Sequence, residues 1–289
     1  MKEPTIYFEL YQPYAQYRNP FTFYYAQTFP LPPKSTVIGM LQNATQRYYD
    51  MSFWDLRVSV HGGFESVFWN YQQFIKGYPK IKINDARPLL MVEQEVKRKK
   101  KKQLLPLYNE GIKAQRTPVH QQELFNGHLH IFIRGNKSLI NEIYSTLEKP
   151  KKVLSLGRSE DIIFIRNLLL LDENEIKCFE SEKSLWLTFP TYIRKDIKLD
   201  DGTRKMFPIK AQKYPVYSIP TFATFYNDDK SIKNKAEINK DKTERKVKFE
   251  RVIYTGFDYV IKLFEPVRYE EITIIDNKKF RIIKEFGWL

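Results

Sequence analysis

The spacing of apolar residues alternates between a strand period and a helix period through the first 170 residues. Ile6, Phe8 and Leu10 alternate with polar and tyrosine positions, which predicts a half-buried strand over residues 5–11. The same reasoning predicts strands at residues 5–11, 54–62, 64–71, 129–134 and 162–171, and helices at residues 35–48 and 139–147. Coarsely, the first 170 residues run in the order strand, helix, strand, strand, helix, strand, with a long basic excursion in the middle. This order is the ferredoxin-like split βαβ arrangement, in which two helices cover one face of a four-stranded antiparallel sheet. The other face is then open to a ligand or to a second domain.

The predicted fold class is α+β, with a ferredoxin-like domain over residues 1–175 and a smaller β-rich region over residues 176–289. Gly62 and Gly63 separate two strand-like stretches and indicate a hairpin. Residues 226–250 mix both charges and contain few apolar residues, so they are expected to form a mobile loop or an exposed hairpin.

The balance of charge favours an anionic partner. The chain has 48 Lys and Arg against 34 Asp and Glu, a formal net charge of +14. Nucleic acid is the first candidate, an anionic membrane surface is the second, and a solvated basic surface is the plain alternative. Six consecutive cations, Lys97 to Lys102, lie inside the chain between strand-like segments, where a hairpin that contacts phosphates fits better than a linker.

The cysteine content and the length of the apolar stretches indicate the cellular compartment of the protein. Cys178 is the only cysteine, which suits a reducing cytoplasm. No apolar stretch is long enough to cross a bilayer. We therefore expect a soluble, cytoplasmic protein with no membrane partner.

Common catalytic and metal-binding signatures are missing from the sequence, which contains no GxxxxGK[ST], HExxH, GxSxG or paired CxxC motif. His128 and His130 share a strand face, but they lack a third ligand, so cross-strand packing or surface placement is expected and neither a metal nor a cofactor is predicted. Glu160 and Asp161 are interpreted as charge partners of Arg158 within a loop.

Three short stretches offer contacts for a phosphate or a base. In "FPLPPKSTVIGML" the prolines fix the entry to a helix, and Lys34, Ser35 and Thr36 add donors at its N-terminus, although an ordinary capped helix is the alternative. In "SLGRSED" a glycine permits a turn and an arginine can fork onto phosphate oxygens. Aromatic rings around Arg18 offer stacking faces, although about half of them are expected to pack in the core or at an interface. These rings are Tyr14, Tyr17, Phe21, Phe23, Tyr24 and Tyr25.

The proline-rich helix entry, the basic excursion and "LSLGRSED" together resemble the Cas five family of CRISPR–Cas systems, RAMP-type subunits of type I Cascade complexes. The Tyr-rich, Pro-broken second half looks most like members of a type I-B-like complex. The resemblance implies a ferredoxin-like (RAMP/RRM-like) fold with a β-hairpin thumb at about residues 85–118. It implies binding of the 5′ handle of the crRNA, and contact with the large subunit and the backbone subunits.

The resemblance also implies an RNA-binding set. Lys34, Ser35 and Thr36 match the helix-opening motif, and Gly157 and Arg158 match the glycine-rich loop. The full predicted set is Tyr17, Arg18, Lys34, Ser35, Thr36, Arg47, Arg87, Lys97, Arg98, Lys99, Lys100, Arg116, Gly157 and Arg158. Contact of the basic run with target DNA near the PAM is left open.

Two other functions are weighed against a non-catalytic RNA cap. One branch of the family cleaves precursor crRNA within the repeat without a metal, and the general acid–base candidates here would be His120, Lys113 and Tyr108. A stand-alone nucleic-acid-binding protein would explain the charge but not the motifs.

Overall fold

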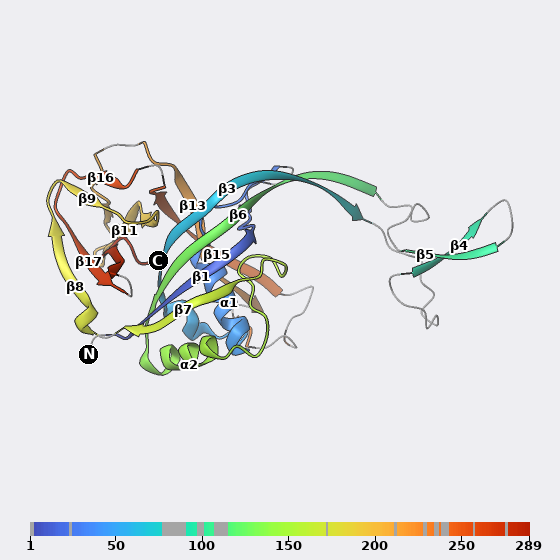
Figure 1. Ribbon diagram of the computed structural model, residues 1–289, viewed down its shortest axis with the longest axis horizontal. Coiled ribbons are helices and arrows are strands. Elements are labelled where there is room, and N and C mark those ends of the chain that lie inside the picture. The colour runs from blue at the N-terminus through green and yellow to red at the C-terminus, as the bar shows by residue number, and fades with distance from the viewer. Residues whose placement is uncertain are drawn as a thin grey trace. The chain divides into compact units, whose positions relative to one another are not determined.

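Figure 1 shows the computed structural model, a mixed α+β protein that is rich in strands. The structure describes residues 3–22, 25–76, 91–96, 101–106, 115–171, 173–210, 213–227, 230–233, 237, 243–256, 258–274 and 277–289. Within these ranges two α-helices are present, α1 over Lys34–Thr45 and α2 over Lys137–Glu148. The predicted mixed class is therefore confirmed.

The main sheet is assembled from strands that are distant in sequence. In this sheet β1 (Thr5–Ala15) pairs antiparallel with β6 (Gln115–Arg134) on one side and with β7 (Phe164–Leu171) on the other. A long strand, β3 (Arg57–Lys76), and a short parallel strand, β2 (Tyr25–Ala26), both pair with β6. The chain order is thus β1, α1, β3, β6, α2, β7, with further short elements between them.

The two helices pack together over one face of this sheet (Figure 1). Ile6, Phe8 and Leu10 of β1 point into a core that also contains Val37 and Ile140 from the helices. Asn136 caps α2 by accepting a hydrogen bond from the Ser138 amide at 2.9 Å. The predicted helix at residues 35–48 ends earlier, because Gln46 adopts a left-handed backbone with φ of 60°.

The other face of the sheet is covered, so the prediction that β1 is half-buried is wrong. Tyr7 and Phe132 pack against Phe280, Ile282 and Trp288 from the C-terminal part of the chain. These residues come from a three-stranded sheet of β8 (Ile176–Ser181), β17 (Val267–Thr273) and β18 (Lys279–Ile283), and from the chain after it. The second face of the sheet was predicted to be open to a ligand or to a second domain. In the structure it is covered by the C-terminal part of the same chain.

A buried ion pair joins the main sheet to this C-terminal sheet. The Arg134 guanidinium lies 2.8 Å from the Glu270 carboxylate, and both side chains are buried. Arg134 also donates to the Thr5 hydroxyl at 2.9 Å and lies over the Trp288 ring at 4.3 Å from its centroid. The paired, hydrogen-bonded setting offsets part of the cost of burying the two charges.

The rest of the C-terminal part is built from short strands and one long hairpin. In the hairpin β13 (Val216–Asn227) pairs with β15 (Thr243–Tyr254), and β10 (Tyr192–Arg194) and β14 (Lys230–Ser231) extend this sheet. Within residues 226–250, the described positions fit the exposed-hairpin alternative. The remaining short elements are η1 (Met51–Asp55), η2 (Glu173–Glu175), the pair β9 (Ser184–Trp186) and β16 (Val260–Lys262), and the pair β11 (Asp196–Lys198) and β12 (Arg204–Met206).

The hairpin predicted at Gly62-Gly63 is wrong, because β3 runs without a break through both glycines. Gly62 has a φ of +114°, and its amide donates to the Pro190 carbonyl at 3.0 Å. A Cβ at this position would lie 2.1 Å from the His128 carbonyl oxygen. Glycine therefore permits a close approach of two backbones inside a strand rather than a turn between strands.

The chain divides into two compact units. Unit 1 contains residues 1–19, 27–68 and 123–289, and unit 2 contains residues 20–26 and 69–122. In unit 2, β4 (Met91–Val96) and β5 (Lys101–Pro106) form an antiparallel pair. This pair falls inside the region predicted to form a thumb, of which residues 85–90, 97–100 and 107–114 lie outside the described ranges.

Candidate nucleic-acid interface

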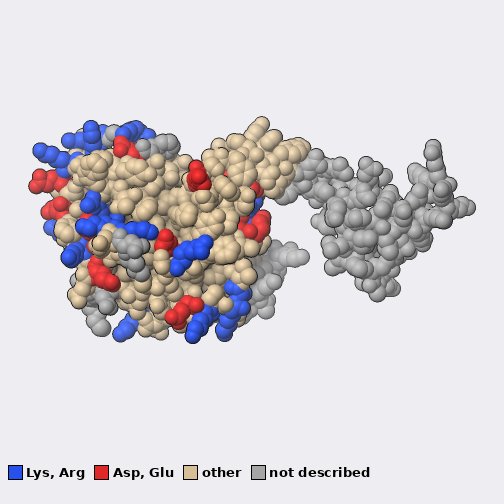
Figure 2. Space-filling model, in the orientation of Figure 1, with Lys and Arg blue, Asp and Glu red and all other residues tan. Residues whose placement is uncertain are grey.

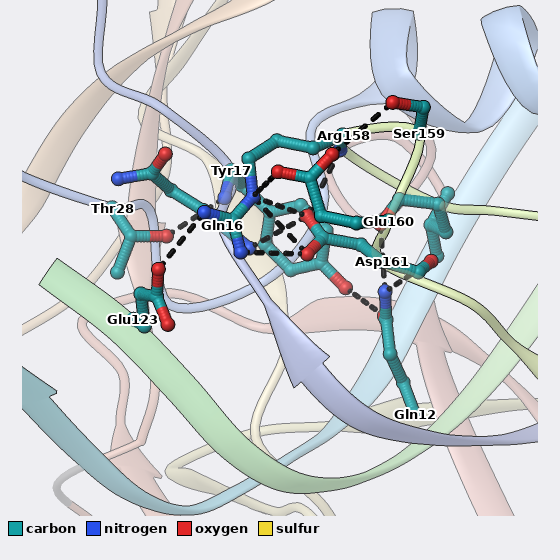
Figure 3. Close-up of polar contacts among 10 residues, drawn as sticks. Gln12, Gln16, Tyr17, Thr28, Glu123, Arg158, Ser159, Glu160 and Asp161 are labelled. Carbon is teal, nitrogen blue, oxygen red and sulfur yellow. Dashed lines mark hydrogen bonds and ion pairs between the residues drawn. The ribbon is translucent and has the colours of Figure 1, made fainter. Parts of the chain in front are cut away.

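The glycine–arginine loop is built around one buried carboxylate, that of Asp161 (Figure 3). One Asp161 oxygen accepts the backbone amides of Gln16 at 3.0 Å and Arg158 at 2.9 Å. The Arg158 guanidinium donates to the other oxygen at 2.8 Å. Hydrogen bonds of this kind to a charged acceptor are strong, so they fix the conformation of the loop.

Arg158 is surrounded by acidic partners. Besides Asp161, its guanidinium lies 2.9 Å from Glu123 and 3.3 Å from Glu160. Burial opposes its charge, but hydrogen bonds to Asp161 and Glu123 raise the pKa of Arg158 above its usual range. The interpretation of Glu160 and Asp161 as partners of Arg158 is confirmed. In this arrangement the guanidinium organises the loop and faces carboxylates.

Gly157 exposes backbone at the tip of this loop. Its φ is +117°, a region that glycine alone adopts readily. A Cβ would lie 2.7 Å from Asp161 Oδ2 and 3.0 Å from the Gln16 carbonyl oxygen. Gln12 fixes the same loop from β1 by donating to the carbonyl oxygens of Leu156 at 2.7 Å and Asp161 at 3.2 Å.

Tyr17 and Arg18 are adjacent in sequence but have opposite environments. The Tyr17 side chain is 2% exposed and donates to Gln12 Oε1 at 2.5 Å, so its ring presents no open face to a base. Burial, with a smaller effect of Asp161, raises the pKa of Tyr17 well above its ordinary value. Arg18 is exposed, and its backbone bridges Thr28.

At the N-terminus of α1, the Lys34 side chain is bonded within the protein rather than exposed as a donor. Pro33 is the N-cap residue and supplies no side-chain cap. The Lys34 ammonium donates to the Trp54 carbonyl oxygen at 3.1 Å, and the side chain is buried. Burial, together with the nearby Arg194 charge, lowers the pKa of Lys34 to about 8. Ser35 and Thr36 are half-buried at the first turn.

The predicted basic residues divide into described and undescribed ones. Arg47 forms ion pairs with Asp50 and Glu142, and its guanidinium lies 5.4 Å from the centroid of the Phe53 ring. The backbone of Arg116 lies in β6. Arg87, Lys97, Arg98, Lys99 and Lys100 lie outside the described residues.

The histidines lie in contrasting surroundings. His120 is exposed in unit 2, whereas Lys113 and Tyr108 lie outside the described residues. His130 and His61 are buried, and His130 Nδ1 lies 2.9 Å from the Tyr7 hydroxyl. Among the residues that the structure describes, no group of three or more His, Cys, Asp or Glu side chains is placed to hold a metal ion.

A group of exposed aromatic rings in unit 2 was only partly anticipated. Tyr25 of β2 and Trp69 and Tyr71 of β3 are all exposed, and His120 of β6 lies among them. Tyr25 belongs to the predicted aromatic set, but the two β3 residues do not. The alternation in "FESVFWNY" was the available signal, since it places Trp69 and Tyr71 on one strand face.

A family model for CRISPR-associated protein (Cas_Cas5) matches residues 5–249. The chain belongs to this family. A search of curated proteins found no match. Because the family match spans the main sheet, both helices and the unit 2 strands, it covers every residue of the candidate interface.

Solved structures give weaker likenesses to the Cas5-family chain. A chain of a CRISPR RNA-guided surveillance complex is 11% identical, with a TM-score of 0.46 and coverage of 91% of each chain. A CRISPR protein from Archaeoglobus fulgidus is 9% identical, with a TM-score of 0.39 and coverage of 96% of this chain and 98% of that one. A crystal structure of a Cas protein is 17% identical, with a TM-score of 0.33, and the match covers 55% of this chain and 59% of that one. At these identities and scores the likenesses do not bear on function.

The charges of the Cas5-family chain are not gathered on the face of the described residues seen in Figure 2. There Lys and Arg are interspersed with Asp and Glu on a surface made mostly of other residues. By sequence, unit 2 has twelve Lys and Arg against four Asp and Glu, a net charge of +8 out of the +14 of the whole chain. Among the described helices, none is both long enough and apolar enough to cross a membrane.

Proposed function

We propose that this protein is a non-catalytic subunit of a type I CRISPR Cascade, of a type I-B-like kind, that binds and caps the 5′ handle of the crRNA. In this role it contacts the large subunit and the backbone subunits and supports interference with foreign DNA in the cytoplasm. The observation that carries the proposal is membership of the Cas5 family over residues 5–249.

The sheet and the charge distribution support the proposal. The order β1, α1, β3, β6, α2, β7, with β1 between β6 and β7, fits a ferredoxin-like domain over residues 1–175 with the β-rich region after it. The β4–β5 pair fits a β-hairpin thumb at about residues 85–118. A net charge of +8 on unit 2 favours a polyanion, because each neutralised phosphate releases counterions.

We assign RNA contacts to the predicted residues by their exposure. Arg18 and the Gly157 backbone are exposed, and Ser35 and Thr36 are half-buried. The cations at Arg87, Lys97, Arg98, Lys99, Lys100 and Arg116 keep their assignment from the sequence. The other predicted residues have partners within the protein and support the positions of the exposed groups. They are Tyr17, Lys34, Arg47 and Arg158.

Binding of guide RNA with and without its handle tests the proposal. The purified chain should bind a crRNA that carries the 5′ handle at least about tenfold more tightly than the same RNA without the handle, a difference of about 1.4 kcal/mol. The two RNAs are compared at equal length by adding nucleotides at the 3′ end, so that the number of phosphates is constant. Equal affinity for the two RNAs would refute handle capping.

A metal-independent endoribonuclease is the competing function, because His120 is exposed beside the tyrosines Tyr25 and Tyr71. Incubation with repeat RNA in EDTA separates the two. A non-catalytic cap leaves the RNA intact. Cleavage at one position that disappears in His120→Ala would replace the proposal with the enzyme.

A further inference from the structure

We propose that Tyr25, Trp69, Tyr71 and His120 form a stacking site for an unpaired base of RNA on unit 2. The inference deepens the proposed function and rests on it for the identity of the polymer as RNA. It adds a base-binding site whose four members come from three strands. Three of these members, Trp69, Tyr71 and His120, lie outside the aromatic set predicted from the sequence.

The geometry of the four rings carries the inference. The Tyr25 and His120 rings are stacked, with centroids 5.6 Å apart and an interplanar angle of 14°. Tyr71 meets His120 edge-on at 5.4 Å, and Trp69 meets Tyr25 edge-on at 6.3 Å. Offset and edge-to-face contacts of this kind are the arrangements that aromatic pairs prefer.

Backbone pairing explains why these rings meet. Tyr25 and His120 are direct partners in the parallel pairing of β2 with β6. Trp69 and Tyr71 are two residues apart on β3, which pairs with β6, and alternate residues of a strand share a face. Strand pairing therefore brings β2, β3 and β6, which carry the four rings, into one sheet.

The rings are open to solvent, unlike those of the core. Tyr25 is 65% exposed, Trp69 49% and Tyr71 53%. Single exposed aromatic rings are common on protein surfaces, whereas a group of exposed rings indicates a binding surface. The fixed rings offer π-faces on which a base can stack without a large loss of side-chain entropy.

The net charge of unit 2 indicates which class of ligand binds to the four rings. Unit 2, which contains all four rings, has a net charge of +8 by sequence. Stacking faces combined with a strong positive charge are what a single-stranded nucleic acid requires, because the rings bind bases and the cations bind phosphates. A protein partner with an apolar surface would not account for the charge.

The test uses the full chain and two probes, an unstructured oligoadenylate and an abasic oligomer with the same number of phosphates. Tyr25→Ala and Tyr71→Ala should each weaken oligoadenylate binding by about 5- to 150-fold, since loss of one stacked base costs about 1 to 3 kcal/mol. Neither substitution should change binding of the abasic oligomer. Trp69 fluorescence should be quenched by oligoadenylate, and the Trp69→Phe variant should lose this part of the signal.

Matched variants distinguish stacking from a general loss of structure. Tyr25→Phe and Tyr71→Phe keep the rings and should bind as the wild type does. Trp186→Ala removes a ring that is 62% exposed in unit 1 and should have no effect. The inference is overturned if the alanine variants bind oligoadenylate normally, or if they lose affinity equally for the abasic oligomer, which would indicate a fold or charge effect.

The outcome can be read separately from that of handle capping. Loss of oligoadenylate binding in the alanine variants supports the stacking site even if the wild type shows no preference for the 5′ handle. A clear handle preference combined with unaffected alanine variants refutes the site and leaves the proposed function in place.

Discussion

At the scale of single residues, the most constrained position of the candidate interface is Gly157. Its backbone conformation is unfavourable for other residues, and its neighbours cannot move easily, because hydrogen bonds from Gln16 and Arg158 hold Asp161. Glycine here serves both the turn and the close approach of Asp161.

We expect Gly157→Ala to destabilise the protein by about 1 to 3 kcal/mol more than Gly202→Ala, because the added methyl group would clash with Asp161. Both glycines have positive φ, +117° and +84°, but a Cβ at residue 202 meets nothing within 4 Å. The comparison therefore separates the clash with Asp161 from the backbone penalty that both sites share. Urea unfolding of the two variants measures the difference. Equal losses of stability would show that the loop adjusts without cost.

The residue types of this loop were predictable, but their partners were not. The sequence identified Gly157, Arg158 and Asp161 as neighbours in one loop. It could not show that Gln16 and Glu123, which are distant in sequence, lie against the same loop. Long-range register brings them there, and register is decided by the burial of whole strand faces.

At the scale of elements, the spacing of apolar residues predicted the burial of an element correctly where one of its faces is buried. It did not do so where both faces are buried. Helix α2 was predicted within two residues because its apolar stripe faces one core. The sequence predicts that one face of strand β1 is exposed to solvent, but Tyr7 on that face is buried against Phe280. Tyrosine fits both settings, so its presence alone does not reveal a second covering layer.

The basic run Lys97–Lys102, which follows β4 and whose last two residues begin β5, gives the prediction at this scale. Replacing Lys97 through Lys102 by glutamine should weaken RNA binding and flatten its dependence on salt. The slope of log K against log salt should fall by about 0.7 for each phosphate of a single strand that the protein no longer neutralises. Filter binding over a range of salt concentrations measures the slope.

Substitution of the five lysines of this run by arginine, with Arg98 kept, is the control. It keeps the charge and should keep the slope, because counterion release depends on the number of phosphates neutralised. An unchanged slope in the glutamine variant would place the phosphate-binding cations elsewhere on the chain and would count against a thumb that binds RNA.

At the scale of the whole molecule, the C-terminal strands complete the fold by covering the second face of the main sheet. His61 and His130 lie in this contact layer, where both meet the Phe280 ring. Burial lowers the pKa of His61 to about 3 and that of His130 to about 4, and the charges of Glu9, Lys278 and His128 act on His130 as smaller effects. Both histidines are therefore neutral in the folded protein near neutral pH.

This burial predicts that acid lowers the stability of the folded protein. Below the ordinary histidine pKa of 6.5 the unfolded chain binds protons that the folded chain does not, so stability falls as the pH decreases from about 6.5 towards 4. Each histidine contributes up to about 1.4 kcal/mol per pH unit within this window. Urea unfolding at about pH 7 and about pH 5 measures the decrease in stability.

The variant His61→Gln/His130→Gln makes the test specific. Glutamine can replace the hydrogen bonds to Ser59 and Tyr7 but does not titrate, so the variant should lose less stability between pH 7 and pH 5 than the wild type, even if it is less stable overall. A pH dependence equal to that of the wild type would mean that the two histidines take up protons without opening the contact layer. The C-terminal strands would then not depend on two neutral histidines to remain packed on the sheet.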